Sequence, residues 1–372
     1  MLTPQDELLC HQLPTTFDHV SQSDLRWTER IVMYGFDRSG DISIMTGMAR
    51  FPNRNVMDAY AMVTLKGQKA RVVRMSTEIS AAPAALSSWT VGPYTYSITE
   101  PLKTVTSTLE SNEQGISLHL ELTGTFPAYE QTPAFHRTRG RVQEDARRFY
   151  QNGIVTGWIE VDGERIEIDP DRWWFGRDHS WGVRHGGGGG SLSEGGDRQP
   201  PEVPDGVLYY MGIFQFDDEL VHFAQRETST GERWQFEGEV LYPLETGRAS
   251  LPIIDVEHEL KFREGRRIID ADSVFTVHRS DRTTDTITVN PMCDFWPGLA
   301  GYDEYNGYAA GMWRGPEYID GFTADLTDLE DMKKVSMLSE TLCEVRMGDK
   351  VGYGLVEMVF MGANPRYGYT GW

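Results

Sequence analysis

Residues 177–184, with the sequence RDHSWGVR, hold the most chemically loaded segment of the chain. Asp178 follows an aromatic run at 173–175, and a carboxyl group beside an apolar wall can have a raised pKa and donate a proton to an alkene or a leaving hydroxyl. His179 can relay or accept a proton near neutral pH. The π face of Trp181 can stabilise developing positive charge without acting as a nucleophile. Asp178, His179 and Trp181 are therefore the candidate catalytic residues for the protonation of an olefin.

The backbone conformation of this segment decides whether these side chains can act together. In a regular strand alternate side chains share a face, which would separate Asp178 from His179 and Trp181. A simple acid–base pair then needs a bulge or a turn, and Gly176 and Gly182 permit one.

Two arginines flank the acid and are candidate substrate-binding residues. Arg177 precedes Asp178, and Arg184 closes the segment. A structural interpretation is equally open: Asp178 forms an ion pair with one of the two arginines, and Trp181 packs in a core, since structural ion-pair networks gather the same residue types.

Four residues elsewhere are candidates for substrate binding, each with packing as the alternative. His222 lies between Val and Phe in an alternating stretch, where a buried barrel histidine is also expected. Asp294 is a carboxylate among aromatic residues, in the sequence CDFWP. Tyr302 and Trp313 can line a pocket wall or pack in a core.

Several other chemistries lack their sequence signatures. Asp178, His179 and His185 can be grouped as metal ligands, but neither HExxH nor CxxC accompanies them, so no metal is expected. Ser180 lacks the GxSxG elbow of a hydrolase. No GxGxxG fingerprint opens a helix, and the glycine run at 186–190 lacks the Lys-Ser/Thr of a phosphate loop. We therefore expect no cofactor.

Composition limits the partners and the compartment. The net charge of −21 disfavours nucleic acid and anionic membrane surfaces, which attract basic residues. The 3 cysteines have neither disulfide-framework nor zinc spacing, the N-terminus shows no signal peptide, and no apolar run is long enough to span a membrane. We expect a cytoplasmic protein with a hydrophobic small-molecule partner and no stable membrane insertion. The oligomeric state stays open.

Alternation of polar and apolar residues with a period of two dominates the sequence and predicts an all-β fold. Short polar turns join many of these stretches, which indicates antiparallel neighbours. An Asp-Gly pair at 162–163 predicts a tight hairpin. Residues 141–151 have the pattern of a helix, and a helical turn is possible near 326–332.

The number of predicted strands exceeds what one open sheet carries comfortably, so we expect two antiparallel barrels packed together. The predicted domains are residues 1–170 and 171–372, with a largely apolar pocket at or near their interface. Barrels of this size can also enclose one small apolar ligand.

A Gly/Ser-rich and then Pro-rich loop at 186–204 leaves directly from the chemically loaded segment. It is interpreted either as an inert insertion or as a mobile flap over the site.

Several stretches resemble the carotenoid 1,2-hydratase / hydroxyneurosporene synthase-like superfamily. Residues 176–184 (GRDHSWGVR) are similar to the central motif R-D-H-S-W-G-x-R of an uncharacterised bacterial branch. Weaker similarities lie at 51–60 (FPNRNVMDAY), 311–315 (GMWRG) and 352–357 (GYGLVE).

The resemblance implies two lipocalin-like barrels and acid–base chemistry on alkenes or polyenes without redox cofactors. The expected function is a hydratase, dehydratase, cyclase or double-bond isomerase that acts on an isoprenoid, steroid-like or aromatic compound. The alternative is a non-catalytic carrier of hydrophobic ligands.

Overall fold

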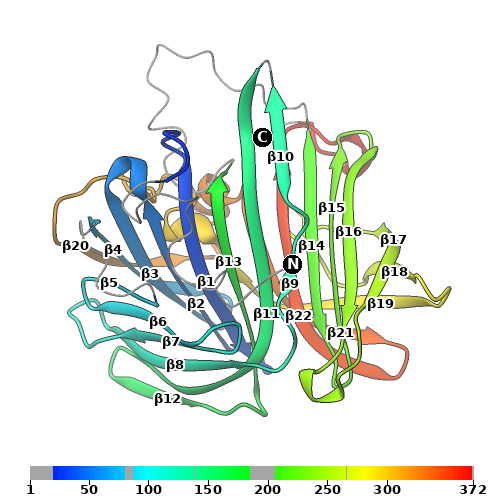
Figure 1. The fold of residues 1–372 in the computed structure, drawn as a ribbon, viewed down its shortest axis with the longest axis horizontal. Coiled ribbons are helices and arrows are strands. Elements are labelled where there is room, and N and C mark those ends of the chain that lie inside the picture. Colours follow the sequence, from blue (N-terminus) through cyan, green and yellow to red (C-terminus); the bar gives the residue numbers. More distant parts are fainter. Residues whose placement is uncertain (1–19, 80–86, 139, 185–205, 265, 371–372) are drawn as a thin grey trace.

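The computed structural model describes residues 20–79, 87–138, 140–184, 206–264 and 266–370. These residues form two units built from antiparallel strands, a curled sheet at the left of Figure 1 and a closed barrel at the right. The predicted all-β fold class is confirmed. The loop predicted at 186–204 lies outside the described residues.

The curled sheet has fourteen strands, of which eleven follow the order β20-β4-β3-β2-β1-β13-β11-β8-β7-β6-β5, while β9, β10 and β12 pair with β11. It is a half-barrel that does not close completely. Its strands are β1 (Trp27–Asp37), β2 (Ile42–Phe51), β3 (Val56–Leu65), β4 (Lys69–Glu78), β5 (Ser88–Val91), β6 (Tyr94–Glu100), β7 (Thr104–Leu109), β8 (Ile116–Gly124), β9 (Tyr129–Glu130), β10 (Ala134–Thr138), β11 (Arg141–Val161), β12 (Glu164–Ile168), β13 (Trp173–Val183) and β20 (Tyr318–Asp325).

The closed barrel has eight strands, and β14 closes it by pairing with β22. Its strands are β14 (Val207–Gln215), β15 (Leu220–Thr228), β16 (Arg233–Leu241), β17 (Leu251–Glu259), β18 (Ser273–Arg279), β19 (Thr284–Phe295), β21 (Leu338–Met347) and β22 (Lys350–Met361). The helical elements of the described chain are short: α2 (Leu329–Met332) and the 3-10 turns η2 (Pro52–Arg54), η3 (Leu244–Thr246), η4 (Pro297–Ala300), η5 (Lys333–Val335) and η6 (Pro365–Tyr367).

The predictions for local elements have different outcomes. Asp162 and Gly163, at φ 53° and 85°, form the predicted tight turn between β11 and β12. The helical turn expected near 326–332 corresponds to α2. The helix predicted over 141–151 is wrong, because this segment belongs to the 21-residue strand β11, which pairs with β13 and with β10. Strand pairing on both sides overrides the helix preference of its Arg, Gln and Glu residues.

Two strands from beyond the predicted boundary at residue 170 belong to the half-barrel. β13 inserts between β1 and β11 of the half-barrel, and β20 adds an edge strand beside β4. The division into domains 1–170 and 171–372 remains a prediction.

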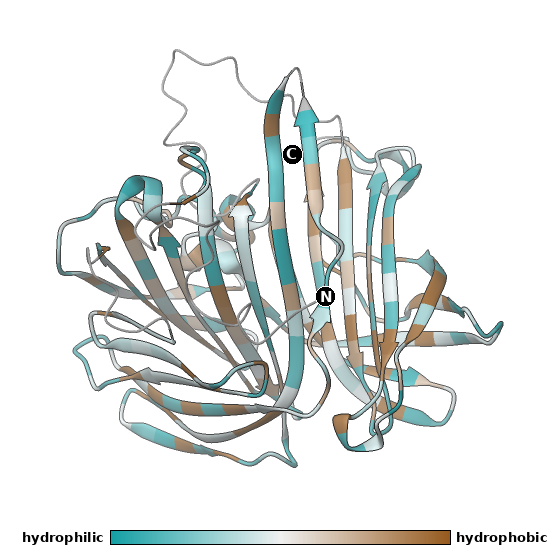
Figure 2. Cartoon of the chain, in the orientation of Figure 1, coloured by the Kyte–Doolittle hydropathy of each residue, from teal (hydrophilic) through white to brown (hydrophobic). Residues whose placement is uncertain are grey.

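Each unit has its own core, and a third core lies between them. Along many strands hydrophilic and hydrophobic residues alternate (Figure 2), so one face packs inward. The barrel interior contains a core of aromatic rings in mutual contact, which include Tyr210, Phe214, Phe223 and Phe275. Between the units, the even-numbered side chains of β1 and β13 pack against the outer face of β14, β15, β21 and β22.

Among the described residues, no helix has the length and apolar character needed to cross a membrane.

Candidate active site

A small cavity between the half-barrel and the barrel collects three carboxyl groups around one arginine. Its volume is about 30 Å³, room for roughly one or two water molecules. It is lined by Val32, Tyr34, Arg148, Tyr150, Asp178, Arg184, Tyr302, Leu338, Glu340 and Glu357.

Strand register brings these side chains together. On β13, Asp178 lies opposite Val32 of β1 on one side and Tyr150 of β11 on the other. From the barrel, Glu340 of β21 lies directly opposite Glu357 of β22. Directly opposed residues on antiparallel strands point to the same face, so each sheet presents its own acidic group to the interface.

Arg148 is the central cation of the cavity. Its Nε lies 3.6 Å from Oδ2 of Asp178, and its Nη1 lies 3.9 Å from Oε1 of Glu357. Nη1 also donates a hydrogen bond to the Tyr150 hydroxyl. Most of each side chain is buried, with exposures of 16% for Arg148, 11% for Asp178 and 14% for Glu357. One guanidinium therefore faces several carboxyl groups, in a region where water is largely excluded.

Burial raises the pKa values of these acids. Burial, with a contribution from the Glu357 charge, raises the pKa of Asp178 to about 6, although Arg148 opposes the shift. Burial and the charges of Glu357 and Asp178 raise the pKa of Glu340 well above its usual range, and burial also raises that of Glu357. Oδ1 of Asp178 and Oε2 of Glu340 have no hydrogen-bond partner among the described residues. Burial thus favours the protonated forms of the acids in this cavity.

Two tyrosines provide aromatic walls. Tyr34 lines the cavity from β1, and its buried hydroxyl has no hydrogen-bond partner in the described part of the chain. Burial raises the pKa of Tyr302 to about 12, so its phenol stays neutral, and the Arg30 guanidinium lies 4.2 Å from its ring centre. Neutral phenols can donate hydrogen bonds, and their π faces can stabilise a nearby cation.

His179 and Trp181 lie on the opposite face of β13 from Asp178. β13 pairs in unbroken register with both neighbours, so the bulge needed for an acid–base pair is absent from it. His179 Nε2 lies 3.0 Å from Oε1 of Glu29, and both side chains are completely buried. Trp181 contacts the His179 ring at 5.5 Å and packs against a small separate core. The structure therefore does not bring either residue to the acid.

The two arginines that flank Asp178 in the sequence lie in different places in the structure. Arg177 is buried on the inner face of the half-barrel and donates to Oε1 of Gln151 at 3.1 and 2.6 Å. Arg184 lines the cavity and donates to the Ser180 hydroxyl at 2.6 Å. The ion-pair partner that the structure gives Asp178 is Arg148, which the sequence interpretation did not consider.

His222 lies next to the cavity residues without lining the cavity. Its ring stacks 4.0 Å from that of Tyr129 and 5.3 Å from that of Tyr150. Burial, with the charge of Arg148, lowers the pKa of His222 to about 3, so the ring is neutral. Neither ring nitrogen has a hydrogen-bond partner among the described residues.

The remaining candidates lie away from the cavity. Asp294 accepts hydrogen bonds from Arg263 at 2.5 and 3.2 Å and from the Thr341 hydroxyl at 3.0 Å, so its carboxylate is already engaged. Trp313 is 54% exposed and does not line the cavity. Of the six predicted substrate-binding residues, Tyr302 and Arg184 line it.

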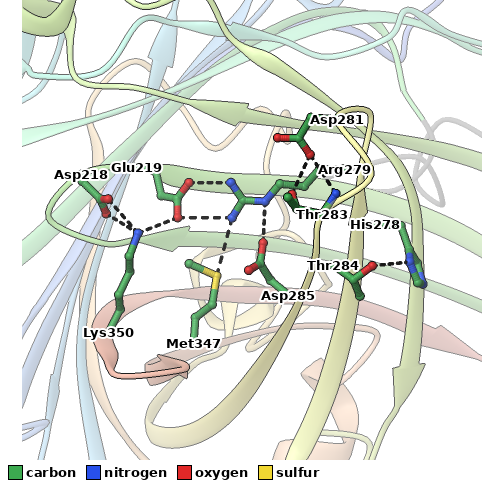
Figure 3. Close-up of polar contacts among 10 residues, drawn as sticks. All are labelled: Asp218, Glu219, His278, Arg279, Asp281, Thr283, Thr284, Asp285, Met347 and Lys350. Atoms are coloured by element: carbon green, nitrogen blue, oxygen red, sulfur yellow. Dashed lines mark hydrogen bonds and ion pairs between the residues drawn. The ribbon is translucent and has the colours of Figure 1, made fainter.

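A second charged cluster ties together three hairpins at one end of the barrel (Figure 3). Arg279 forms a two-bond ion pair with Glu219 at 2.7 and 3.2 Å and a further pair with Asp285 at 2.5 Å. Lys350 bonds Glu219 at 2.9 Å and Asp218 at 2.7 Å. Charges are matched by partners here, and this cluster is structural.

The structure does not bring Asp178, His179 and His185 together as a metal site within the described residues. No group of three or more His, Cys, Asp or Glu side chains in the described ranges is placed to hold a metal ion. His185, the third member of the predicted set, lies outside those ranges.

Sequence reasoning missed Arg148, Tyr150, Glu340 and Glu357. The first two lie in the segment that was assigned to a helix, which would place their side chains differently. Glu357 had a usable signal, because it is the only charge in the apolar run 355–360 (LVEMVF). A carboxylate in a buried strand is rare unless it has a partner.

Fold and site together define a double-unit antiparallel β protein with a buried acid cluster at the interface. The chain belongs to DUF8625, a family of unknown function, whose sequence profile matches residues 2–370. No curated protein matches the chain.

A solved structure with a TM-score above 0.5 shares the fold. A candidate AttH protein of Nitrosomonas europaea superposes with a TM-score of 0.55 at 11% identity, covering 91% of this chain and 94% of that chain. Kievitone hydratase of Nectria haematococca has a TM-score of 0.47 at 11% identity, covering 90% and 89% of the two chains. CghA with Sch210972 has a TM-score of 0.47 at 12% identity, covering 90% and 88%. The resemblance to the carotenoid 1,2-hydratase-like superfamily, which is based on sequence motifs, remains a prediction.

Proposed function

We propose that this protein is a cofactor-independent acid–base lyase or isomerase of a hydrophobic small molecule, with Asp178 as the proton donor. The observation that supports this function is the cluster of Asp178, Glu340 and Glu357 around Arg148 in a buried cavity. Acid groups with raised pKa values in a confined site are typical of proton-transfer catalysis.

The reaction begins with the transfer of the Asp178 proton to an alkene carbon. The O–H bond of the acid breaks, a C–H bond forms from the π electrons, and the neighbouring carbon becomes a cation. The Tyr34 and Tyr302 rings and the Asp178 carboxylate stabilise that cation. Attack by a water molecule, which then loses a proton to a carboxylate, gives hydration; loss of a proton from carbon gives isomerisation.

A hydrophobic substrate suits the walls of the site. Val32, Leu338 and the two tyrosine rings offer apolar surface around the acids. The candidate substrate classes are isoprenoid, steroid-like and aromatic compounds. The cavity of about 30 Å³ is far smaller than the roughly 300–1,000 Å³ typical of ligand pockets, so the substrate's bulk must lie outside it.

A non-catalytic carrier of hydrophobic ligands is the second candidate. The observation that favours it is an open cleft of about 680 Å³ at the same interface, large enough for a ligand on its own. A carrier has no need of buried carboxyl groups with raised pKa values, and this argues for the enzyme.

A screen in heavy water separates the two candidates. The purified protein is incubated in D₂O with a library of lipophilic alkenes and alcohols, and bound and released compounds are identified by mass spectrometry. An acid–base enzyme releases a hydrated or rearranged product with deuterium on the protonated carbon, or a dehydrated product that is identified by its loss of water. Compounds that bind and return unchanged, without deuterium, would establish a carrier and refute the enzyme.

A further inference from the structure

The open cleft at the interface lies on the same strand faces as the acid cavity. Trp174 lines the cleft and Asp178 lines the cavity, four positions apart on β13 and on the same face. Tyr353 and Glu357 repeat this relationship on β22. At about 3.3 Å per residue, the two compartments are centred roughly 13 Å apart along the strands.

Along the strands, Tyr34 lies at a position between the two compartments. It lines the cavity, and its ring lies 5.9 Å from that of Trp174 in the cleft. Tyr34 lies opposite Gly176, the residue midway between Trp174 and Asp178. A Cβ atom at position 176 would lie 2.8 Å from Cε2 of Tyr34, so the tyrosine ring occupies space that a side chain there would fill.

No hydrogen bond to the Tyr34 side chain is found in the described structure. Its hydroxyl is buried without a hydrogen-bond partner. Rotation of the ring therefore breaks no hydrogen bond seen among the described residues, and it would uncover Gly176 and join the cleft to the cavity.

The cleft wall combines apolar and aromatic side chains with four charged ones, Arg38, Lys103, Asp217 and Glu245, and suits a ligand that has an apolar body and a polar group. Leu244 and Val351 on its wall are 51% and 41% exposed and supply apolar surface to a ligand. The basic residues of the wall are engaged elsewhere: Arg38 lies 4.8 Å from the Tyr353 ring centre and donates to a backbone carbonyl, and Lys103 pairs with Glu100 at 3.0 Å.

The indole N–H of Trp174, a residue that lines the cleft, has no hydrogen-bond acceptor among the described residues. The Trp174 side chain is only 2% exposed. An unpaired buried donor costs about 1–3 kcal/mol. A ligand oxygen would offset this cost once a small shift of the cleft wall uncovers the N–H.

We propose that the cleft binds the apolar body of an elongated, uncharged substrate with an oxygen near Trp174, and that Tyr34 is the movable partition across which its reacting end reaches Asp178. The part about the reacting end rests on the proposed function. Within the candidate classes, this geometry favours a linear isoprenoid or an extended polycycle over a single aromatic ring.

Calorimetric titration with geraniol, farnesol and geranylgeraniol, which differ by one isoprene unit each, tests the proposal. Affinity should rise with chain length. Trp174→Phe, which removes the N–H and keeps the aromatic ring, should weaken binding of all the alcohols roughly threefold to tenfold, as expected for one hydrogen bond. Tyr34→Ala should improve binding of the longest alcohol about tenfold and leave that of geraniol nearly unchanged.

Two further variants serve as controls. Tyr34→Phe keeps the partition and should show the wild-type length preference. Tyr210→Phe removes another buried hydroxyl without a partner, but inside the barrel core, and should change nothing. Each variant's melting temperature establishes that it is folded.

Affinities that ignore chain length, or that are unchanged by both Trp174→Phe and Tyr34→Ala, would overturn the proposal. The same titrations with Asp178→Asn keep the two proposals apart. Binding that survives in this variant supports the cleft whatever the identity of the acid, because the measurement needs no turnover.

Discussion

Glu340 and Glu357 lie directly opposite each other on β21 and β22, with their side chains in the interface cavity. Like charges in directly opposed positions destabilise a sheet, and burial raises the cost. The pKa values of both carboxyl groups are raised, that of Glu340 well above its usual range. The pair is therefore more stable in the folded protein when it holds a proton.

Stability should accordingly fall as pH rises. A carboxyl group with a raised pKa binds its proton more tightly in the folded state, so its contribution is fully present at acid pH and is lost as pH rises through the folded pKa. Glu340→Gln removes this ionisation. We expect the variant to have a higher unfolding free energy than wild type at pH 8, because it has no carboxyl group to ionise in the buried site.

Urea unfolding of wild type and Glu340→Gln between pH 5 and pH 8.5 measures this effect. Glu344→Gln, on the same strand but in a surface pair with Arg346, is the matched control and should follow the wild-type curve. Parallel curves for Glu340→Gln and wild type would show that Glu340 ionises normally.

Arg148 should set the pH range of activity. The proton donor is active while Asp178 is protonated, and its pKa is about 6, so kcat/KM should fall as pH rises through that value. Arg148→Met removes the cation that favours the Asp178 carboxylate, and the midpoint should move upward by roughly 1–2 pH units. Arg148→Lys keeps a cation at this position, so the midpoint of its profile should lie close to that of wild type. A profile with an unchanged midpoint in Arg148→Met would rule out this coupling.

His179 should stabilise the fold and take no part in turnover. It is buried against Glu29 on the other face of β13. Removing one member of a buried pair costs about 3–5 kcal/mol. His179→Ala should lose stability of this order while its folded fraction keeps wild-type kcat, as urea unfolding and active-site titration will show. A stable His179→Ala protein with kcat reduced a hundredfold would instead show that His179 takes part in catalysis.

His222 should make the protein sensitive to acid. Its pKa is lowered to about 3, so the folded state keeps the ring neutral while the unfolded chain gains a proton below pH 6.5. The stability that depends on the neutral ring is therefore lost as pH falls from 6.5 toward 3. His222→Phe, which keeps the stack with Tyr129 and Tyr150, should be more stable than wild type at pH 4 by roughly 3 kcal/mol. An unchanged difference between the two proteins at pH 4 and pH 7 would contradict this.

Much of the fold was predictable because β structure leaves a local signature. Alternation with a period of two and an Asp-Gly turn at 162–163 are properties of neighbouring residues, and both indicated the elements that the structure has. The segment 141–151 was assigned wrongly because its side chains favour helix locally, whereas its conformation is fixed by β13 and β10, which are distant in sequence.

The site was predictable only in part, for a related reason. Asp178 stands out in the sequence because an acid follows an aromatic run, and alternation also predicted its separation from His179. Glu340, Glu357 and Arg148 come from three other strands, and no local pattern states which strand lies opposite which. Their association depends on how the barrel packs on the half-barrel, and that is a property of the whole fold.

The central claim is that Asp178 donates the proton, and turnover of Asp178→Asn is its most direct test, on the substrate found by the screen in D₂O. The amide keeps the shape of the side chain and removes its transferable proton, so kcat should fall by roughly 10²–10⁴. Ligand affinity should survive, and unfolding free energy at pH 8 should not decrease, because a buried charge is removed. Glu340→Gln, the rival acid, should retain most of the activity. A folded, ligand-binding Asp178→Asn protein with wild-type turnover would contradict the account.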